Sequence, residues 1–223
     1  MNGHYCFYKD GWVILAMPHY YNPLFPEKKY HIFSRATGNE QLFEKEENYL
    51  FFLQKFKQHV LPIADVWAWC LLPNHFHFMV EIKPIEIIAL HFSETKKGKI
   101  FNEEAVPDFL MERFSNLLNS YTKAFNKVNQ RKGSLFMDYL RRVEITEDAQ
   151  LGATIFYIHK NPVHHGYCKK LEDWRWSSYK AMLSNAPTMI KRMEVLDWFG
   201  SVPYFIRYHE QDIYLKNAVV QDL

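Results

Sequence analysis

Cysteine is scarce in this sequence, and the few cysteines are far apart. The chain has three, Cys6, Cys70 and Cys168, and no CxxC pair. An odd number at wide spacing excludes a disulfide-rich scaffold and argues against a zinc site built from cysteines. Any chemistry that the chain performs must therefore come from other side chains.

Long apolar runs are also lacking. The longest, residues 66–73 and 76–82, are far shorter than the roughly 20 residues of a membrane-spanning helix. At the N-terminus Tyr5, Lys9 and Asp10 interrupt the apolar residues, so the pattern of a signal peptide is absent. We therefore expect no membrane segment and a cytoplasmic location.

Net charge is small, but it is unevenly distributed. The formal net charge of +2 over 223 residues does not by itself indicate a nucleic-acid-binding protein. Between residues 111 and 142, however, seven basic residues face only two acidic ones. Our candidates for contacts with DNA phosphates are Lys123, Lys127, Arg131, Lys132, Arg141 and Arg142. An ordinary solvated helix face is the alternative interpretation.

Runs rich in aromatic and β-branched residues predict four strands. They cover residues 30–35, 63–72, 75–82 and 134–143. Between the second and third runs, Pro73-Asn74 favours a turn, so these two strands should form an antiparallel hairpin.

Apolar residues at steps of three and four predict helices over residues 40–60 and about 107–128. Thr146 can cap a further helix, whose end should be set by Pro162. The resulting order predicts an α+β, ferredoxin-like antiparallel sheet with helices on one face and the other face free. We divide the chain into a domain of residues 1–184 and a helical C-terminal extension of residues 185–223.

Two histidines alternate with phenylalanines in the third predicted strand. Because strand residues two apart point to the same face, His75 and His77 project together, while Phe76 and Phe78 point into the core. Two imidazoles at this spacing can bind one divalent ion and leave positions for a third ligand, water and a phosphate oxygen. The alternative is a pair of partly exposed strand histidines without a metal.

Tyr157 and Asn161 are four residues apart near the end of the last predicted helix, so they share a face. A tyrosine nucleophile and an amide metal ligand could converge there. A core tyrosine followed by a helix-ending asparagine is the alternative. His159, His164 and His165 lie close in the sequence, but we assign no general base, because His159 points away from Tyr157.

Five motifs occur in an order and spacing that resemble the single-tyrosine HUH transposases, and in particular the REP-associated tyrosine transposases. In that family a histidine-hydrophobic-histidine motif precedes a tyrosine helix that ends in asparagine-proline. The resemblance covers roughly residues 28–182. The motifs are YHIFSR, LLPNHFHFMV, NQRKGSLF, YIHKNPVHHGY and DWRWSSY.

The resemblance implies an HUH catalytic domain that cuts and rejoins single-stranded or hairpin DNA. Tyr157 would be the nucleophile, and Mg²⁺ or Mn²⁺ would be bound by His75 and His77. Asn161 matches the family position at which a polar residue can complete the metal site. Relatives with this chemistry include dimers and monomers, so a homodimer stays open.

Two other functions are compatible with the residues. A non-catalytic or domesticated nucleic-acid binder of the RNA-recognition type would need stacking aromatics on the open sheet face, where HFHFMV places histidines and methionine. A metal-dependent phosphodiesterase that uses water as nucleophile would tolerate Tyr157→Phe, and a tyrosine transposase would not.

Overall fold

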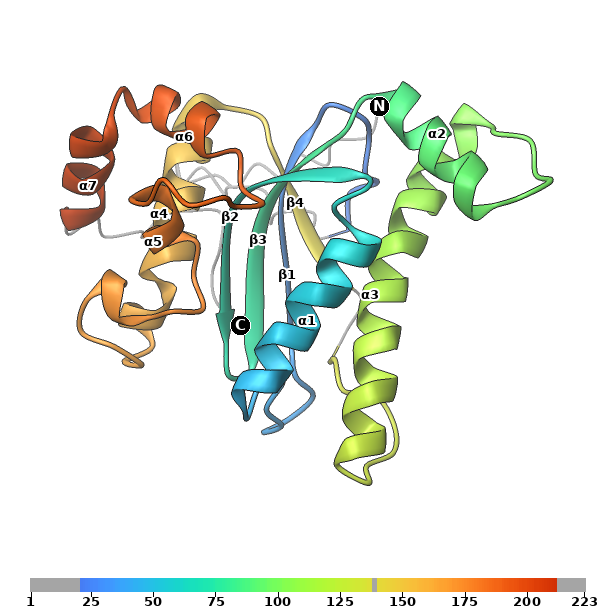
Figure 1. Cartoon of the computed structure of the whole chain (residues 1–223), viewed down its shortest axis with the longest axis horizontal. Helices are drawn as coiled ribbons and strands as arrows, with labels where there is room; N and C mark the ends of the chain where they lie inside the picture. Colours follow the sequence, from blue (N-terminus) through green and yellow to red (C-terminus); the bar gives the residue numbers. More distant parts are fainter. Residues whose placement is uncertain (1–20, 138–139, 212–223) are drawn as a thin grey trace, which may run out of the picture.

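The computed structural model describes residues 21–137 and 140–211 (Figure 1). Its centre is a four-stranded sheet in which every neighbouring pair of strands is antiparallel, in the order β2-β3-β1-β4. The strands are β1 (Lys29–Arg35), β2 (Ala64–Leu72), β3 (His75–Ile82) and β4 (Arg141–Ile145). This is the strand order of a ferredoxin-like fold, so the predicted fold class is confirmed.

Two long helices cover one face of the sheet. Helices α1 (Glu46–His59) and α3 (Val106–Val128) contact each other and lie beside the strands (Figure 1). Phe56 of α1 stacks on Phe78 of β3 with ring centroids 4.1 Å apart, and Phe52 packs against Phe76 at 5.1 Å. The prediction that the phenylalanines of the HFHF run enter the core is thus confirmed, and each buried ring contributes about 1.5–3 kcal/mol.

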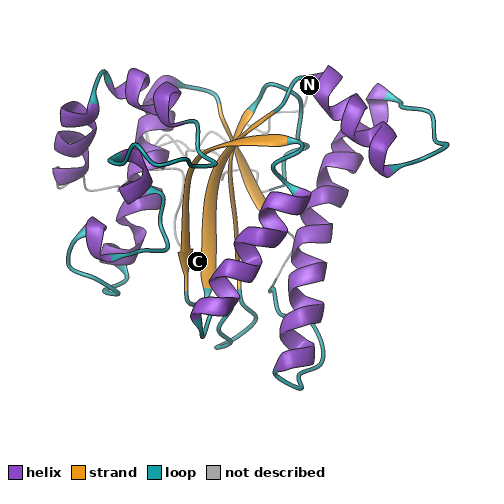
Figure 2. Ribbon diagram, viewed as in Figure 1, coloured by secondary structure: helices purple, strands orange, loops and turns teal. Residues whose placement is uncertain are grey.

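We had expected the other face of the sheet to be free, but α4 (Asp148–His164) lies on it. This helix contacts β2 and β3, and helices therefore flank the sheet on both sides (Figure 2). Leu151, Ile155 and Ile158 are buried on α4, and this apolar face needs a covered surface to pack against. The helix that carries Tyr157 is thereby brought to the face on which the histidines of β3 project.

β1 lies between β3 and β4, and its end lies beside the start of β3. Arg35 is opposite His75, and Phe33 is opposite His77. The predicted β2–β3 hairpin is confirmed, with Leu72 paired with His75 across the Pro73-Asn74 turn. The turn therefore fixes the position of both histidines relative to the sheet.

The fourth strand begins later than predicted. Residues 134–137 form no ladder and contact the sheet through one bridge, between Ala36 and Phe136. Leu135 and Phe136 are buried in that segment, so their apolar character reflects packing of a loop rather than a strand. Residues 138 and 139 of the predicted strand lie outside the described residues.

Helix α4 also continues past Pro162, which had been predicted to end it, and it stops at His164. Thr146 does not cap it, since Glu147 occupies the cap position without a side-chain hydrogen bond. Instead, the Thr146 N–H donates to Gln150 Oε1 at 3.0 Å. A proline near the last turn costs the helix only the one hydrogen bond that its nitrogen cannot donate.

The remaining elements are short. The connection from β3 to α3 contains helix α2 (Ile85–Thr95) and the 3₁₀ turn η1 (Glu103–Ala105), and η2 (Leu171–Asp173) follows α4. The sequence had not indicated helix α2. The C-terminal helices are α5 (Tyr179–Met182), α6 (Arg192–Phe199) and α7 (Val202–Glu210).

The described part of the predicted extension, residues 185–211, is helical as expected and packs on α4 and β2. The Lys191 N–H donates to the Val66 carbonyl oxygen at 2.8 Å, and Phe205 is fully buried. A Cβ added at Gly152 of α4 would lie 2.4 Å from the Trp198 ring, so glycine allows α6 to approach closely. The division at residue 184 stays a prediction.

Among residues 21–137 and 140–211, no helix is long and apolar enough to cross a membrane.

Candidate active site

The side chains of His75 and His77 project from β3 toward α4, as the alternation of the strand predicts. His77 is 2% exposed, whereas His75 is partly exposed. Their rings meet edge to face with centroids 5.1 Å apart. The two imidazoles are therefore neighbours, one of them inside the protein and the other at its surface.

Asn161 lies between the two imidazoles. Its Oδ1 is 3.1 Å from His75 Nε2, and its Nδ2 is 3.4 Å from His77 Nε2. The Asn161 side chain is 1% exposed, so its position is fixed by these two contacts and by helix α4. The three residues that we predicted as metal ligands are thus brought together, with both Nε2 atoms directed at the same amide group.

The outer nitrogen of each imidazole, Nδ1, is the one that does not face Asn161, and it has its own hydrogen-bond partner. His75 Nδ1 is 2.7 Å from Asn74 Oδ1, and His77 Nδ1 is 3.0 Å from Nε2 of His31 on β1. Since Asn74 Oδ1 only accepts, His75 donates from Nδ1, and in the neutral ring Nε2 then carries a lone pair. That lone pair faces Asn161 Oδ1, and two acceptors placed face to face suit a shared cation. Such outer partners orient metal-binding histidines.

Burial favours the neutral form of the inner imidazole. Loss of solvent lowers the pKa of His77 well below its usual range, and the nearby His75 lowers it further. A neutral imidazole is the form that binds a metal ion, so no proton has to be displaced from His77. The residues present therefore fit a divalent ion in their donor atoms and in their protonation.

Tyr157 lies one turn before Asn161 on the same face of α4. Its ring meets His77 edge to face at 5.4 Å and His31 at 5.9 Å. It is 6% exposed. The predicted nucleophile and the predicted metal ligands therefore occupy one site, which is formed by β1, β3 and α4.

The hydrogen bonds at the end of α4 hold Asn161 in its helical position despite the proline that follows. The His165 N–H donates to the Asn161 carbonyl oxygen, and the Tyr167 N–H donates to that of Pro162 at 2.8 Å. Gly166 adopts the left-handed conformation, with φ of +72°, that closes this type of helix end. These bonds keep Asn161 within the helix, on the face that also carries Tyr157.

The remaining histidines of this region divide into two groups. His159 is buried on the far side of α4 and binds Ser178 Oγ at 2.8 Å and His209 Nε2 at 3.0 Å. It therefore joins α4 to α7 and does not reach the site. His164 and His165 are exposed, and the His165 ring lies 4.9 Å from that of His75 at the edge of the site.

The predicted DNA-binding residues differ in their solvent exposure and in the partners that they already have within the protein. Lys123, Lys127 and Lys132 are exposed, and Arg141 is partly exposed. Arg131 pairs with Glu40 at 2.9 Å and donates to the Ser134 carbonyl oxygen at 2.8 Å.

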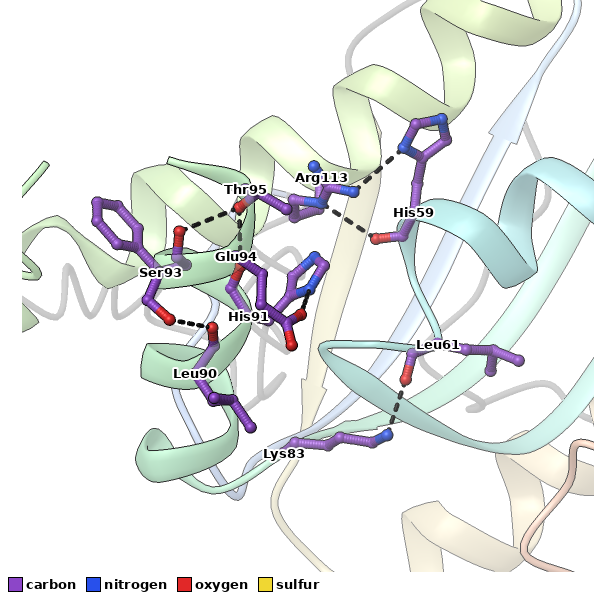
Figure 3. A network of polar contacts seen from close by, with 10 residues as sticks. His59, Leu61, Lys83, Leu90, His91, Ser93, Glu94, Thr95 and Arg113 are labelled. Carbon is purple, nitrogen blue, oxygen red and sulfur yellow. Dashed lines mark hydrogen bonds and ion pairs between the residues drawn. The ribbon is translucent and has the colours of Figure 1, made fainter. Parts of the chain in front are cut away.

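Two arginines of the basic segment are buried. Arg142 donates to the carbonyl oxygens of Tyr21, Asn22 and Leu140, which favours a structural role for it. Arg113 of the same segment faces α1, where its guanidinium contacts the carbonyl oxygen and Nδ1 of His59 (Figure 3).

Sequence reasoning missed His31 and Asn74 as contributors to the site. Asn74 was assigned only to a turn, and His31 appeared only within a predicted strand. The signal that could have found His31 is its alternation with Phe33 and Arg35, which places it on the face opposite to that of Ile32. Its position beside His77 depends on the pairing of β1 with β3, which a single sequence does not reveal.

Comparison with known proteins points to the same family as the five sequence motifs. No protein-family model matches the chain. A protein of Haemophilus influenzae (strain ATCC 51907 / DSM 11121 / KW20 / Rd), named "Putative REP-associated tyrosine transposase", is 26% identical over 115 residues, which are 50% of this chain and 57% of that protein. The match thus spans little more than half the length of this curated relative.

A solved structure of a REP-associated tyrosine transposase bound to a REP hairpin shares the fold. The TM-score is 0.53 at 16% identity, and the match covers 77% of this chain and 89% of the other. The predicted resemblance to the REP-associated tyrosine transposases is therefore confirmed, in sequence over half of the chain and in fold over about three quarters of it.

Proposed function

We propose that this protein is a DNA transposase that cuts and rejoins single-stranded DNA, most simply at hairpin ends, through a covalent bond to Tyr157. One observation carries the proposal. A buried tyrosine lies against His77, and the Nε2 atoms of His77 and of its neighbour His75 are directed at an amide one turn along the same helix. The sequence relative and the fold relative, both described as REP-associated tyrosine transposases, support the same assignment.

In the proposed reaction the phenolic oxygen of Tyr157 attacks a phosphorus atom of the DNA backbone. A bond from phosphorus to the tyrosine oxygen forms, and the bond from phosphorus to the 3′ oxygen breaks. The phenol loses its proton, and the leaving oxygen gains one to become a free 3′-hydroxyl. The strand stays linked to the protein as a 5′-phosphotyrosine, so attack by a 3′-hydroxyl can later reverse the reaction and rejoin DNA.

A phenol needs assistance in this reaction, because its ordinary pKa is about 10 and little phenolate exists near pH 7. A bound Mg²⁺ or Mn²⁺ would supply it by polarising the phosphoryl oxygen. His75, His77 and Asn161 would hold the ion. In the described part of the chain no group of three or more His, Cys, Asp or Glu side chains is placed to bind a metal, so an amide is the natural third ligand.

The protein's own groups perform two further tasks. The rings of His31 and His77 meet that of Tyr157 edge to face and limit its orientation, which fixes the line of attack. Burial of His77 and Asn161 excludes water from the inner side of the site. Exclusion of water favours transfer to the tyrosine over hydrolysis.

Contacts to the phosphates of the DNA backbone would come from the exposed lysines. Lys132 follows α3 in a segment that runs along the end of β1, where the Thr37 N–H donates to the Leu135 carbonyl oxygen and the Met137 N–H donates to that of Arg35. Because Arg35 is opposite His75, this segment lies at the same end of the sheet as the site. Lys123 and Lys127, on α3, belong to the opposite face of the sheet.

The proposal is tested by trapping the covalent intermediate. The full chain is incubated with labelled hairpin DNAs carrying single-stranded tails, in the presence of Mn²⁺, and then denatured. We expect a protein–DNA adduct that Tyr157→Phe abolishes, because phenylalanine keeps the ring and lacks the attacking oxygen. Tyr204→Phe, a change at an exposed tyrosine of α7, is the matched control and should leave the adduct unchanged.

Each alternative function gives a different result in this experiment. Cleavage without an adduct, unaffected by Tyr157→Phe, would show that water is the nucleophile and would contradict the proposal. Binding without cleavage of any hairpin would identify a domesticated binding protein.

A further inference from the structure

A line of aromatic rings leads from the metal-site histidine across the protein surface. The His165 ring lies 4.9 Å from that of His75, Tyr167 lies 6.3 Å from His165, and Trp174 lies 5.5 Å from Tyr167. His165 and Tyr167 are exposed, Tyr167 by 41%, and Trp174 is partly exposed. Exposed rings in contact with one another and continuous with the site are a surface on which flat groups can stack.

The helix end fixes the backbone that carries the first two rings. Gly166 has φ of +72°, its N–H donates to the Val163 carbonyl oxygen at 3.0 Å, and the Tyr167 N–H donates to that of Pro162 at 2.8 Å. These two bonds close α4 in a rigid capping motif. His165 and Tyr167 are therefore held in a defined position relative to Asn161, although both side chains lie at the surface.

The third ring is anchored to the sheet. The indole Nε1–H of Trp174 donates to the Leu71 carbonyl oxygen at 3.0 Å, one residue before the end of β2. The line of rings is thus attached at one end to the helix of Tyr157 and at the other to the strand beside β3. Pre-formed rings lose little conformational entropy when a ligand binds.

Two exposed lysines beside the Tyr167 ring favour a polyanion with flat groups. Lys169 and Lys170 are exposed and follow Tyr167 closely in the chain. Arg175, next to Trp174, pairs with Glu46 at 2.9 Å, and the exposed Glu172 and Asp173 precede Trp174, so the favourable charge lies beside Tyr167. Aromatic rings beside positive charge are the combination by which proteins bind single-stranded nucleic acid. A duplex keeps its bases stacked and does not offer their faces, so unpaired bases are the matching ligand.

The aromatic residues of the basic helix do not offer such a surface. Tyr121 and Phe125 of α3 are 1% and 5% exposed, as core positions should be. His77 and Met79 of β3 do not provide it either, because both are buried, and His75 is only partly exposed. Contacts to bases close to the site must therefore come from another element, and the segment after α4 supplies exposed rings.

We propose that His165, Tyr167 and Trp174 form a stacking track that binds unpaired bases of the DNA strand next to the scissile phosphate. The proposal rests on the proposed function for the identity of the strand. The track would hold the single-stranded segment in place, so that one backbone phosphate lies at Tyr157. Its bases would stack on the rings, with no dependence on their sequence beyond stacking strength.

The test uses a hairpin DNA with a thymine tail that contains one 2-aminopurine. All proteins carry Tyr157→Phe, so that binding is measured without cleavage. Into this background we introduce Tyr167→Ala, which removes the ring, and Tyr167→Phe, which keeps it. Tyr204→Ala, at a tyrosine that is 63% exposed on α7, is the control for loss of a surface ring.

We expect Tyr167→Ala to weaken binding of the tailed hairpin by about 5- to 150-fold, the range for loss of one base-stacking ring. Quenching of the 2-aminopurine should be lost with it. Tyr167→Phe and Tyr204→Ala should match the parent protein, and a blunt hairpin without a tail should be bound equally by all four proteins.

Unchanged affinity and quenching in Tyr167→Ala would overturn the track, as would an equal loss in Tyr204→Ala or with the blunt hairpin. Failure of the proposed function would look different. The chain with Tyr157 intact would then form no adduct, whatever the effect of Tyr167→Ala on binding.

Discussion

His31 holds His77 through its outer nitrogen and stacks on its ring, with centroids 5.2 Å apart. When Nε2 of His77 binds a metal ion, its Nδ1 must carry the proton and donate it to an acceptor. Nε2 of His31 is in position to accept that hydrogen bond. His31 is thus a positioning residue that fixes both the tautomer and the orientation of His77.

We expect His31→Phe to weaken Mn²⁺ binding by roughly 10- to 100-fold, the range for loss of an outer partner of a metal-binding histidine. Phenylalanine keeps the stacked ring and removes the hydrogen bond, so the loss reports on the bond. The measurement is titration of the protein with Mn²⁺, with free Mn²⁺ followed by electron paramagnetic resonance.

Two variants make this result specific. In His31→Gln an amide can reach the same nitrogen, so part of the affinity should return. Tyr157→Phe should bind Mn²⁺ as the unmodified protein does, because the phenol is not a ligand. Mn²⁺ affinity unchanged in His31→Phe would show that His77 is oriented by its surroundings alone.

Residues with strong local signals were predictable at this scale, and residues with only long-range partners were not. The alternation in HFHF placed His75 and His77 on one face, and four-residue spacing placed Tyr157 over Asn161. The partner of His77 lies 46 residues away on another strand, and that pairing has no local signature.

At the scale of elements, helix α7 is bound to α4 by a buried pair of histidines. His209 Nδ1–H donates to the Phe205 carbonyl oxygen at 2.8 Å, so its Nε2 accepts from His159 Nδ1. The Ser178 hydroxyl in turn donates to His159 Nε2, and its oxygen accepts from the Trp69 N–H of β2. Three elements are therefore joined by one chain of hydrogen bonds, and burial favours the neutral form of both imidazoles by lowering their pKa values.

This arrangement predicts loss of stability in mild acid. Burial, more than any other effect, lowers the pKa of His209 from 6.5 to about 4 in the folded protein. The folded state therefore disfavours the proton, and its stability is complete above pH 6.5 and falls as pH decreases from 6.5 toward 4. The loss from His209 is about 1.4 kcal/mol per pH unit in that window.

Urea unfolding at pH 7 and pH 5 measures this effect. We expect the difference in unfolding free energy between the two pH values to be about 2 kcal/mol smaller in His209→Phe than in the unmodified protein. His164→Gln, at an exposed histidine of α4, is the control. Equal pH dependence in His209→Phe and the unmodified protein would contradict the assignment.

Element boundaries show where local patterns were insufficient. The run of residues 134–143 looked like a strand because Leu135 and Phe136 are apolar, but these residues fill the core from a loop. Pro162 looked like a helix end, but hydrogen bonds from His165 and Tyr167 extend the helix past it. In both cases tertiary packing decided the outcome, and the sequence alone could not show it.

For the whole molecule, the important feature is that one chain contributes every group of the candidate site. His75 Nε2 lies 3.1 Å from Asn161 Oδ1, and α4 contacts both β2 and β3 of the same chain. The C-terminal helices hold α4 from the other side through His209 and Phe205. A homodimer stays a prediction, but the site does not require a partner's helix to complete it.

This arrangement can be tested by mixing two inactive proteins. His77→Ala lacks a proposed metal ligand and Tyr157→Phe lacks the proposed nucleophile, so neither should form the covalent DNA adduct. If the tyrosine of one subunit acted with the histidines of another, a mixed dimer would contain one complete site. Tyr157 of the His77→Ala subunit would meet His77 of the Tyr157→Phe subunit, and the adduct would be recovered. Because Tyr157 meets His77 of its own chain at 5.4 Å, we expect the mixture to stay inactive.

Two controls decide whether that negative result is meaningful. Unmodified protein mixed with Tyr157→Phe must form adduct in proportion to the unmodified fraction, which shows that the variant does not inhibit the reaction. The two variants must also be denatured and refolded together before the assay, so that subunits can exchange. Adduct recovered after co-refolding would show that α4 moves between chains, and the site would then have to be assigned to a dimer.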